Sequence, residues 1–344
     1  MNKIIIGPFL GELGWETLYW SGICNQYINK FDFSEIYVIC IKGHEGFYPY
    51  AKNFFYVPDK YVPPAVSQNA YILDNWINGY PGKATKKINL IRSLRTSIRN
   101  LSFKKIYQEK PYLSGENLYD EINSWLSDLL SRNNLKNCKH LNPLDESCID
   151  EIGLGTKYIN GIPKIIRPSI YRSYGFSPHI DKELIPEDIK NTIQAKDIAI
   201  FPRYRKERRP DKNSSEDFYV DLINNINSKY PDRNIFLIGA PGGAYFVDKK
   251  IPGTIDLINL PAGVESSRLL IHMYVLNNIY LSLGSISGAI LLALSCGSNA
   301  ITWGEKEQFN RYHIENISLN KLIYIPKTSI ALDECLSNIE LALQ

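Results

Sequence analysis

Short apolar runs alternate with amphipathic stretches along the whole chain. The runs at 4–6 and 198–201 are apolar at every position, which is typical of strands buried on both faces of a parallel sheet. After the second run, Phe218, Leu222 and Ile226 recur at helical spacing and predict an amphipathic helix. The order strand, loop, helix, strand therefore predicts an α/β protein built from βα units.

The same pattern assigns the remaining elements. We expect strands at 3–7, 35–41, 197–201, 234–238, 255–260 and 322–325. We expect helices over about 18–27, 91–101, 117–130, 215–229, 264–276 and 331–343. The stretch 280–304 contains a strand, a Gly/Ser loop, a compact apolar helix and a second strand, whereas 131–150 is polar and predicts a loop.

The length and the pattern together predict two domains. A chain of 344 residues exceeds a usual single core, and domains of roughly 150 to 180 residues are expected. Residues 153–178 are rich in Gly, Pro, Tyr and Ser, and the strand–helix pattern restarts at 197. We therefore expect Rossmann-like domains at 1–178 and 179–344, with the last helix either in the second domain or packed back on the first.

Composition argues against several classes of protein. A net charge of +3, from 39 basic and 36 acidic residues, predicts no global affinity for nucleic acid. The 6 cysteines and 5 histidines show no metal-ligand spacing, so we expect free thiols, no metal site and no cofactor. No signal peptide and no apolar run of about 20 residues is present, which predicts a cytoplasmic protein, with peripheral attachment to the inner membrane as a variant.

One segment is strongly basic. Residues 82–110 contain nine lysines and arginines and one acid, Glu109. If the segment is helical, Arg92, Arg95 and Arg99 share a stripe beside the apolar face. The stripe is either a solvated helix face or a surface for phosphates of DNA, lipid headgroups or a lipid-linked pyrophosphate. The sequence does not decide between these alternatives.

Phosphate-binding chemistry gathers in the loops after the strands of the second half. Carboxyl ends of parallel strands meet at one sheet edge, so these loops converge. Arginine forks and a helix that begins in a Gly/Ser loop both bind phosphate, and a carboxylate suits a ribose diol. The candidates are Arg203, Arg205, Arg208, Gly239, Ser285, Ser287, Gly288 and Glu305. Each also has a simpler interpretation as tight packing or surface charge.

The first βα loop has a different character. It contains Gly11 and Gly14 together with Glu12, Trp15 and Glu16, and two carboxylates repel a pyrophosphate. This loop is therefore interpreted as an acceptor or catalytic loop. The aromatic-rich stretch 47–56 follows the second strand and its histidine, and we expect it to line or cover a cleft.

The second half resembles the donor-binding domain of GT-B glycosyltransferases, most closely the heptosyltransferase-like enzymes and more distantly the bacterial fucosyltransferase-like group. The resemblance covers roughly residues 197–305. It consists of the arginine loop after a strand, a strand ending in Gly239-Ala-Pro241, a Ser-Gly loop opening a helix, and a strand ending in Trp303-Gly304. The usual Asp-Ser-Gly loop and the following helix histidine are absent, so a heptose donor is not implied.

The resemblance implies a metal-independent glycosyltransferase, of the hexosyl- or pentosyltransferase type, with a nucleotide-diphosphate sugar as its donor substrate. By the resemblance, Arg203, Arg208, Ser287 and Gly288 lie near the diphosphate. A first-domain carboxylate or histidine would act as the base; Glu12 and Glu16 are the candidates, with Glu12 preferred because it lies in the loop, and His44 is the reserve. Glu16 is interpreted as a first-turn helix residue favoured by the helix dipole.

Several alternatives stay open. The acceptor is either a bacterial surface glycan or lipid-linked sugar, as in polysaccharide biosynthesis, or hydroxymethylated duplex DNA, as in phage DNA modification, reached through the basic helix 83–105. A sugar-nucleotide epimerase and a non-catalytic sugar-phosphate binding protein fit the same scaffold. The donor base and sugar, the stereochemistry and the oligomeric state are not determined by the sequence.

Overall fold

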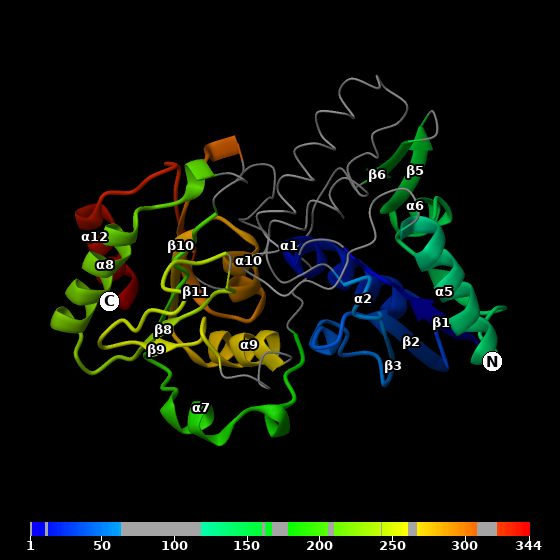
Figure 1. The fold of residues 1–344 in the computed structure, drawn as a ribbon, viewed down its shortest axis with the longest axis horizontal. Helices are drawn as coiled ribbons and strands as arrows, with labels where there is room; N and C mark the ends of the chain where they lie inside the picture. Colours follow the sequence, from blue (N-terminus) through cyan, green and yellow to red (C-terminus); the bar gives the residue numbers. More distant parts are fainter. Residues whose placement is uncertain are drawn as a thin grey trace.

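The computed structural model describes residues 2–10, 13–62, 118–159, 162–166, 178–205, 210–241, 243–260, 267–307 and 322–344. Several expectations fall outside these residues: Glu12, Arg208 and the whole basic segment with Arg92, Arg95 and Arg99. The side chain of Trp15 is also outside them, although its backbone is described. Figure 1 shows the described elements gathered around two separate sheets.

The first sheet has the strand order β3-β2-β1-β4, and its strands are parallel. The strands are β1 (Lys3–Ile6), β2 (Glu35–Cys40), β3 (Asn53–Tyr56) and β4 (Lys139–Leu141). β1 lies at the centre, with Ile4 opposite Ile36 on one side and Lys139 on the other. Its three isoleucines are fully buried, which explains the unbroken apolar run.

The expectation of a loop over 131–150 is wrong. This stretch contains β4 and the helix α6 (Ser147–Ile152). β4 is three residues long and begins with Lys139 and His140, so it has no apolar pattern of its own. It becomes a strand because β1 supplies its hydrogen-bond partners.

Helices and one hairpin complete the first half. α1 (Leu13–Trp15), the π-helical turn η1 (Glu16–Trp20) and α2 (Ser21–Lys30) follow one another without a break. After β2 comes the short helix η2 (Glu45–Phe47), and α5 (Leu118–Arg132) precedes β4. β5 (Gly155–Ile159) and β6 (Ile162–Ile166) form an antiparallel hairpin.

The second sheet has the order β12-β11-β10-β7-β8-β9, and its strands are parallel. The strands are β7 (Ile198–Ile200), β8 (Ile235–Leu237), β9 (Ile255–Asp256), β10 (Leu281–Ser285), β11 (Asn299–Trp303) and β12 (Leu322–Ile325). The longer helices are α8 (Glu216–Lys229), α9 (Arg268–Asn278), α10 (Gly288–Ser295) and α12 (Leu332–Leu343). The short helices are η3 (Lys182–Leu184), α7 (Glu187–Thr192) and η4 (Pro210–Lys212).

Helices cover both faces of the second sheet, as in a doubly wound fold. Buried residues of α8 and α12 share one apolar cluster with Leu281 and Leu283, while α9 and α10 share another with Ala199 and Phe236. Ser215 caps α8, because its hydroxyl accepts a hydrogen bond from the Phe218 N–H at 3.1 Å.

The last helix packs within the second half. α12 contacts α8, and Cys335, Ile339 and Ala342 are buried in the cluster around that helix. The Tyr280 hydroxyl also donates to the Ala342 carbonyl at 3.1 Å. In the described residues the apolar face of α12 is covered by α8. The alternative in which the last helix packs on the first domain is therefore not observed.

The two halves meet through glycines. A Cβ added to Gly14 in α1 would lie 3.0 Å from the Gly288 Cα in α10, and one added to Gly46 would lie 2.4 Å from the His179 carbonyl oxygen. Any side chain at these positions would force backbone apart. One apolar cluster continues across this junction, from Trp20 and Phe47 to Met273 and Leu291.

A buried carboxylate joins the start of β7 to its neighbours. Asp197 is fully buried and accepts hydrogen bonds from the Gln194 N–H at 2.7 Å, the Asn234 N–H at 2.9 Å and the Asn234 side-chain amide at 3.1 Å. These bonds satisfy a charge that burial would otherwise make costly.

We predict that Asp197→Ala lowers the free energy of unfolding by about 2 to 4 kcal/mol, because it leaves buried N–H groups without acceptors. Urea unfolding followed by circular dichroism measures this change. The control is Asp232→Ala, which removes an exposed carboxylate paired with Lys196 and should change stability little. Equal effects of the two substitutions would contradict the stabilising role of the buried Asp197 hydrogen bonds.

Candidate active site

Glu16 is the buried acid of the first βα loop. It lies in η1 with 1% of its surface exposed. Its Oε1 accepts a hydrogen bond from the Tyr48 hydroxyl at 2.6 Å, and its Oε2 lies 2.6 Å from His44 Nδ1. Glu16 does lie in a first helical turn, as the sequence predicts, but its carboxylate is held in the interior by two side chains.

Glu16 is the first residue of the π-helical turn η1. The Ser21 hydroxyl donates to the Glu16 carbonyl at 2.8 Å, and the Thr17 hydroxyl donates to the Leu13 carbonyl at 2.9 Å. These two hydroxyls donate to backbone carbonyls that would accept from backbone N–H groups in a regular α-helix. Single π-helical turns within helices are frequent at functional sites.

His44 lies in the turn between β2 and η2. Its N–H donates to the Ile41 carbonyl at 3.0 Å, and its ring meets Phe47 edge-on with centroids 5.6 Å apart. The side chain is 17% exposed. Because Nδ1 donates to Glu16, the neutral ring carries its lone pair on Nε2. Among the residues that the structure describes, none forms a hydrogen bond with Nε2.

Opposing influences set the pKa of His44. Burial lowers it, but the charge of Glu16, the hydrogen bond to Glu16 and the charge of Glu45 raise it by more, so the pKa of His44 lies above its ordinary value of 6.5. Burial and the nearby Glu16 raise the pKa of Tyr48 well above 10.0, so its hydroxyl stays a hydrogen-bond donor. The arrangement is that of a histidine base oriented by a carboxylate.

The Glu16–His44 pair lies where the two halves of the chain meet. It follows β1 and β2 at their carboxyl ends, the edge at which α/β sheets bind ligands. Gly46, two residues from His44, approaches His179 and Met273 of α9, while α1 and η1 contact α10. A proton-accepting group is therefore placed at the junction with the second half.

The arginine loop that follows β7 is fixed by hydrogen bonds within the chain. Arg203 pairs with Ala244 in an antiparallel bridge and is 6% exposed. The Asn213 side chain accepts hydrogen bonds from the Arg203 guanidinium and from the Arg205 N–H, and donates to the Arg205 carbonyl at 2.8 Å. Arg203 therefore holds the loop together, and the half-buried Arg205 lies on this fixed turn.

The Gly/Ser loops show two kinds of environment. A Cβ on Gly239 would come within 2.7 Å of the Ala244 Cβ, so this glycine permits contact between two loops. Ser285 ends β10 with 1% exposure, and its hydroxyl has no hydrogen-bond partner within the described part of the chain. Ser287 and Gly288 are half-buried at the start of α10, where Gly288 approaches Gly14.

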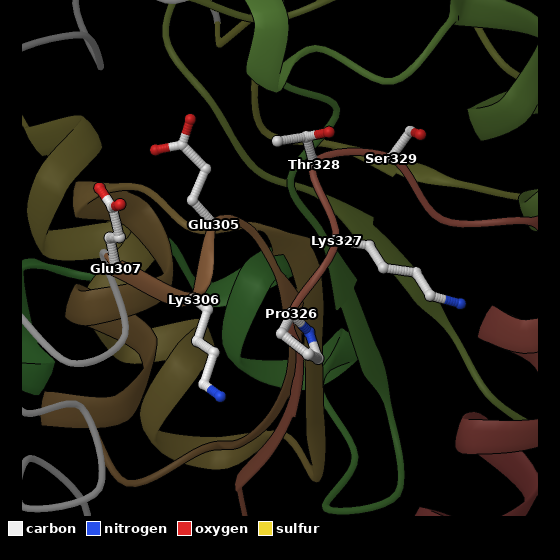
Figure 2. A pocket seen from close by; sticks show the side chains of 7 residues that line it. All are labelled: Glu305, Lys306, Glu307, Pro326, Lys327, Thr328 and Ser329. Carbon is white, nitrogen blue, oxygen red and sulfur yellow. The ribbon is translucent and has the colours of Figure 1, made fainter.

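Glu305 lies in a separate cavity of about 660 Å³ beyond the carboxyl ends of β11 and β12. The cavity is lined by Glu305, Lys306, Glu307, Pro326, Lys327, Thr328 and Ser329. Figure 2 shows the Glu305 carboxylate and the Thr328 hydroxyl extending to the same side of the two loops. The Tyr324 hydroxyl donates to the Glu305 carbonyl at 2.6 Å, which fixes the backbone from which this carboxylate extends.

The structure thus brings His44 together with Glu16, and Arg203 together with Arg205 through Asn213. Gly239 lies beside Ala244, the bridge partner of Arg203. The structure places Glu305 in the cavity at the β11–β12 edge. Tyr48 was missed as a site residue; the only signal was its place in the aromatic-rich stretch 47–56. Within the described ranges, no group of three His, Cys, Asp or Glu could hold a metal ion, and no helix is long and apolar enough to span a membrane.

Solved structures with a similar fold include glycosyltransferases. A glycosyl transferase family 9 structure from Veillonella parvula is similar with a TM-score of 0.60 and 11% identity, over 99% of this chain and 97% of that chain. E. coli ADP-heptose LPS heptosyltransferase II, at 13% identity, has a TM-score of 0.49 over 100% of this chain and 98% of its own. E. coli heptosyltransferase WaaC with ADP, at 10% identity, has a TM-score of 0.46 over 99% and 100%.

At such identities the likeness to the Veillonella parvula structure establishes the fold alone, and the two E. coli structures are too distant to add to it. No family model matches the sequence, and no curated protein is similar to it in sequence. The predicted architecture is confirmed: the chain has the α/β fold of GT-B glycosyltransferases, built on two parallel sheets.

We predict that Glu16→Gln lowers the pKa of His44, because the imidazolium loses the adjacent negative charge. In the unchanged protein the His44 ring should titrate above pH 6.5, and in the variant its midpoint should move to lower pH. NMR titration of the histidine ring signals, with His44→Gln used for assignment, measures both. Glu45→Gln, which removes a charge without breaking the ring's hydrogen bond, should cause a smaller change in the same direction. An unchanged midpoint in Glu16→Gln would contradict the pairing.

Proposed function

We propose that the protein is a glycosyltransferase that moves a sugar from a nucleotide-diphosphate donor to an acceptor hydroxyl. The observation that carries the proposal is the Glu16–His44 pair, a partly exposed base oriented by a buried carboxylate at the junction of a GT-B fold. Such a fold alone supports many activities. The pair adds a group that can accept a proton from an acceptor.

In the proposed reaction His44 Nε2 takes the proton of the acceptor hydroxyl while the hydroxyl oxygen attacks the anomeric carbon of the donor sugar. The bond from that carbon to the phosphate oxygen breaks, and the nucleoside diphosphate leaves with its electron pair. Glu16 stabilises the imidazolium that forms. A single displacement of this kind inverts the anomeric configuration.

The second domain would bind the donor. Arg205 on its fixed turn, together with Arg208, and the Ser287–Gly288 start of α10 would neutralise the leaving diphosphate without a metal ion. The cavity at Glu305 offers a carboxylate and hydroxyls suited to a ribose diol. A surface glycan, a lipid-linked sugar or hydroxymethylated DNA are the proposed acceptors, and salt-sensitive binding to duplex DNA or to anionic vesicles distinguishes them.

We predict that one sugar nucleotide among UDP-, GDP-, CMP-, ADP- and dTDP-sugars stabilises the protein. A ligand at 100 times its Kd adds about 2.7 kcal/mol, which a thermal-shift assay detects. Glu305→Ala should reduce the thermal shift caused by the donor, because the contact with the ribose is lost. Glu307→Ala removes an equal charge from the same cavity and should retain most of the thermal shift. A protein that no nucleotide sugar stabilises would not be a transferase of this kind, and one that converts its donor without acceptor would be an epimerase.

We predict that His44→Gln lowers kcat by about 10² to 10⁴, the usual contribution of general base catalysis, while donor binding is retained. Glu12→Gln tests the competing candidate from the sequence. Steady-state rates with the stabilising donor, and its thermal shift in each variant, separate the two. If Glu12→Gln abolishes turnover and His44→Gln retains most of it, His44 is not the base.

A further inference from the structure

Glu16 has a second partner that the proposed reaction does not use. The Tyr48 hydroxyl donates to Oε1 at 2.6 Å, on the other oxygen from the one that meets His44. Tyr48 is 1% exposed and Glu16 is equally buried. We infer that Tyr48 is a positioning residue, which fixes the Glu16 carboxylate and thereby sets the orientation and proton affinity of His44.

The local chain geometry supports this role. His44 and Tyr48 flank η2, where the Phe47 N–H donates to the His44 carbonyl at 3.0 Å and the Tyr48 N–H donates to the Glu45 carbonyl at 2.9 Å. One short turn therefore presents both side chains to one carboxylate. Gly46, at the middle of the turn, is held against His179, whose N–H donates to the Gly46 carbonyl at 2.7 Å.

The charge balance around Glu16 shows what the hydroxyl contributes. A buried carboxylate needs a donor on each oxygen, and a missing donor makes its ionised form less stable. Burial keeps the nearby Cys24, Cys40 and Tyr50 neutral by raising the pKa of each. Glu45 is the remaining acid that acts on His44. Tyr48 is thus a neutral donor that stabilises the Glu16 charge without competing for the proton.

The chain offers a matched control in Tyr50. Its ring meets that of Tyr48 edge-on with centroids 6.2 Å apart, and its hydroxyl is buried without a hydrogen-bond partner among the described residues. Tyr48→Phe and Tyr50→Phe each remove one buried hydroxyl from the same aromatic pair. The first also removes a hydrogen bond to Glu16, whereas the second does not.

The test is an NMR titration of the His44 ring in the full-length protein, with thermal denaturation to show that both variants fold. The negative charge of Glu16 favours the imidazolium form of His44, and without the Tyr48 hydroxyl that charge is less neutralised, so the imidazolium is favoured more. A hydrogen bond to a charged group is worth enough to raise the titration midpoint by about one pH unit in Tyr48→Phe. Tyr50→Phe should titrate like the unchanged protein.

This inference rests on the proposed base, but it does not need transferase activity to be tested. The inference is overturned if the titration midpoint of His44 is unchanged in Tyr48→Phe, or if it moves equally in Tyr48→Phe and Tyr50→Phe. With a working donor and acceptor, the acid limb of the pH–rate profile should follow the NMR midpoint in Tyr48→Phe, with kcat reduced more than KM is changed. If the midpoint moves and no sugar is transferred from any donor, the positioning role stands and the proposed function fails.

Discussion

The burial of one carboxylate organises the junction of this protein. Glu16 is almost completely removed from water, and an ionised carboxylate in such a place must be met by donors. His44 and Tyr48 meet it from a single turn after β2, so the loop after β1 is joined to the loop after β2. The same bonds leave the lone pair of the neutral His44 ring on Nε2, with which none of the described residues forms a hydrogen bond.

Packing between the two halves holds this group in place. Gly14 and Gly288 bring α1 and α10 within backbone contact, and Gly46 brings the His44 turn against His179 and Met273. Apolar side chains from both halves form one continuous cluster around these contacts. The position of His44 therefore depends on how the second half packs against the first.

In the second half, residues that the sequence marks as candidate phosphate ligands also make structural contacts within the chain. Arg203 is turned inward and bound by Asn213, so its guanidinium organises the loop that carries Arg205. Gly239 permits a close contact with Ala244, because a side chain at this position would collide with the Ala244 Cβ. The Gly/Ser loop at α10 keeps half-buried positions at Ser287 and Gly288. The sequence assigns all of these residues the same candidate role, and only their contacts show that Arg203 and Gly239 shape the loops.

The sequence by itself determined the α/β class, the positions of most strands and helices, and the loops that carry polar chemistry. These features depend on local periodicity and on which residues follow a strand, and both are visible along the chain. It did not determine β4, whose three residues become a strand only beside β1. It also did not show that Glu16 and Tyr48, 32 residues apart, share a hydrogen bond. Tertiary structure decided these points, because contacts between distant residues leave no periodic pattern in the sequence.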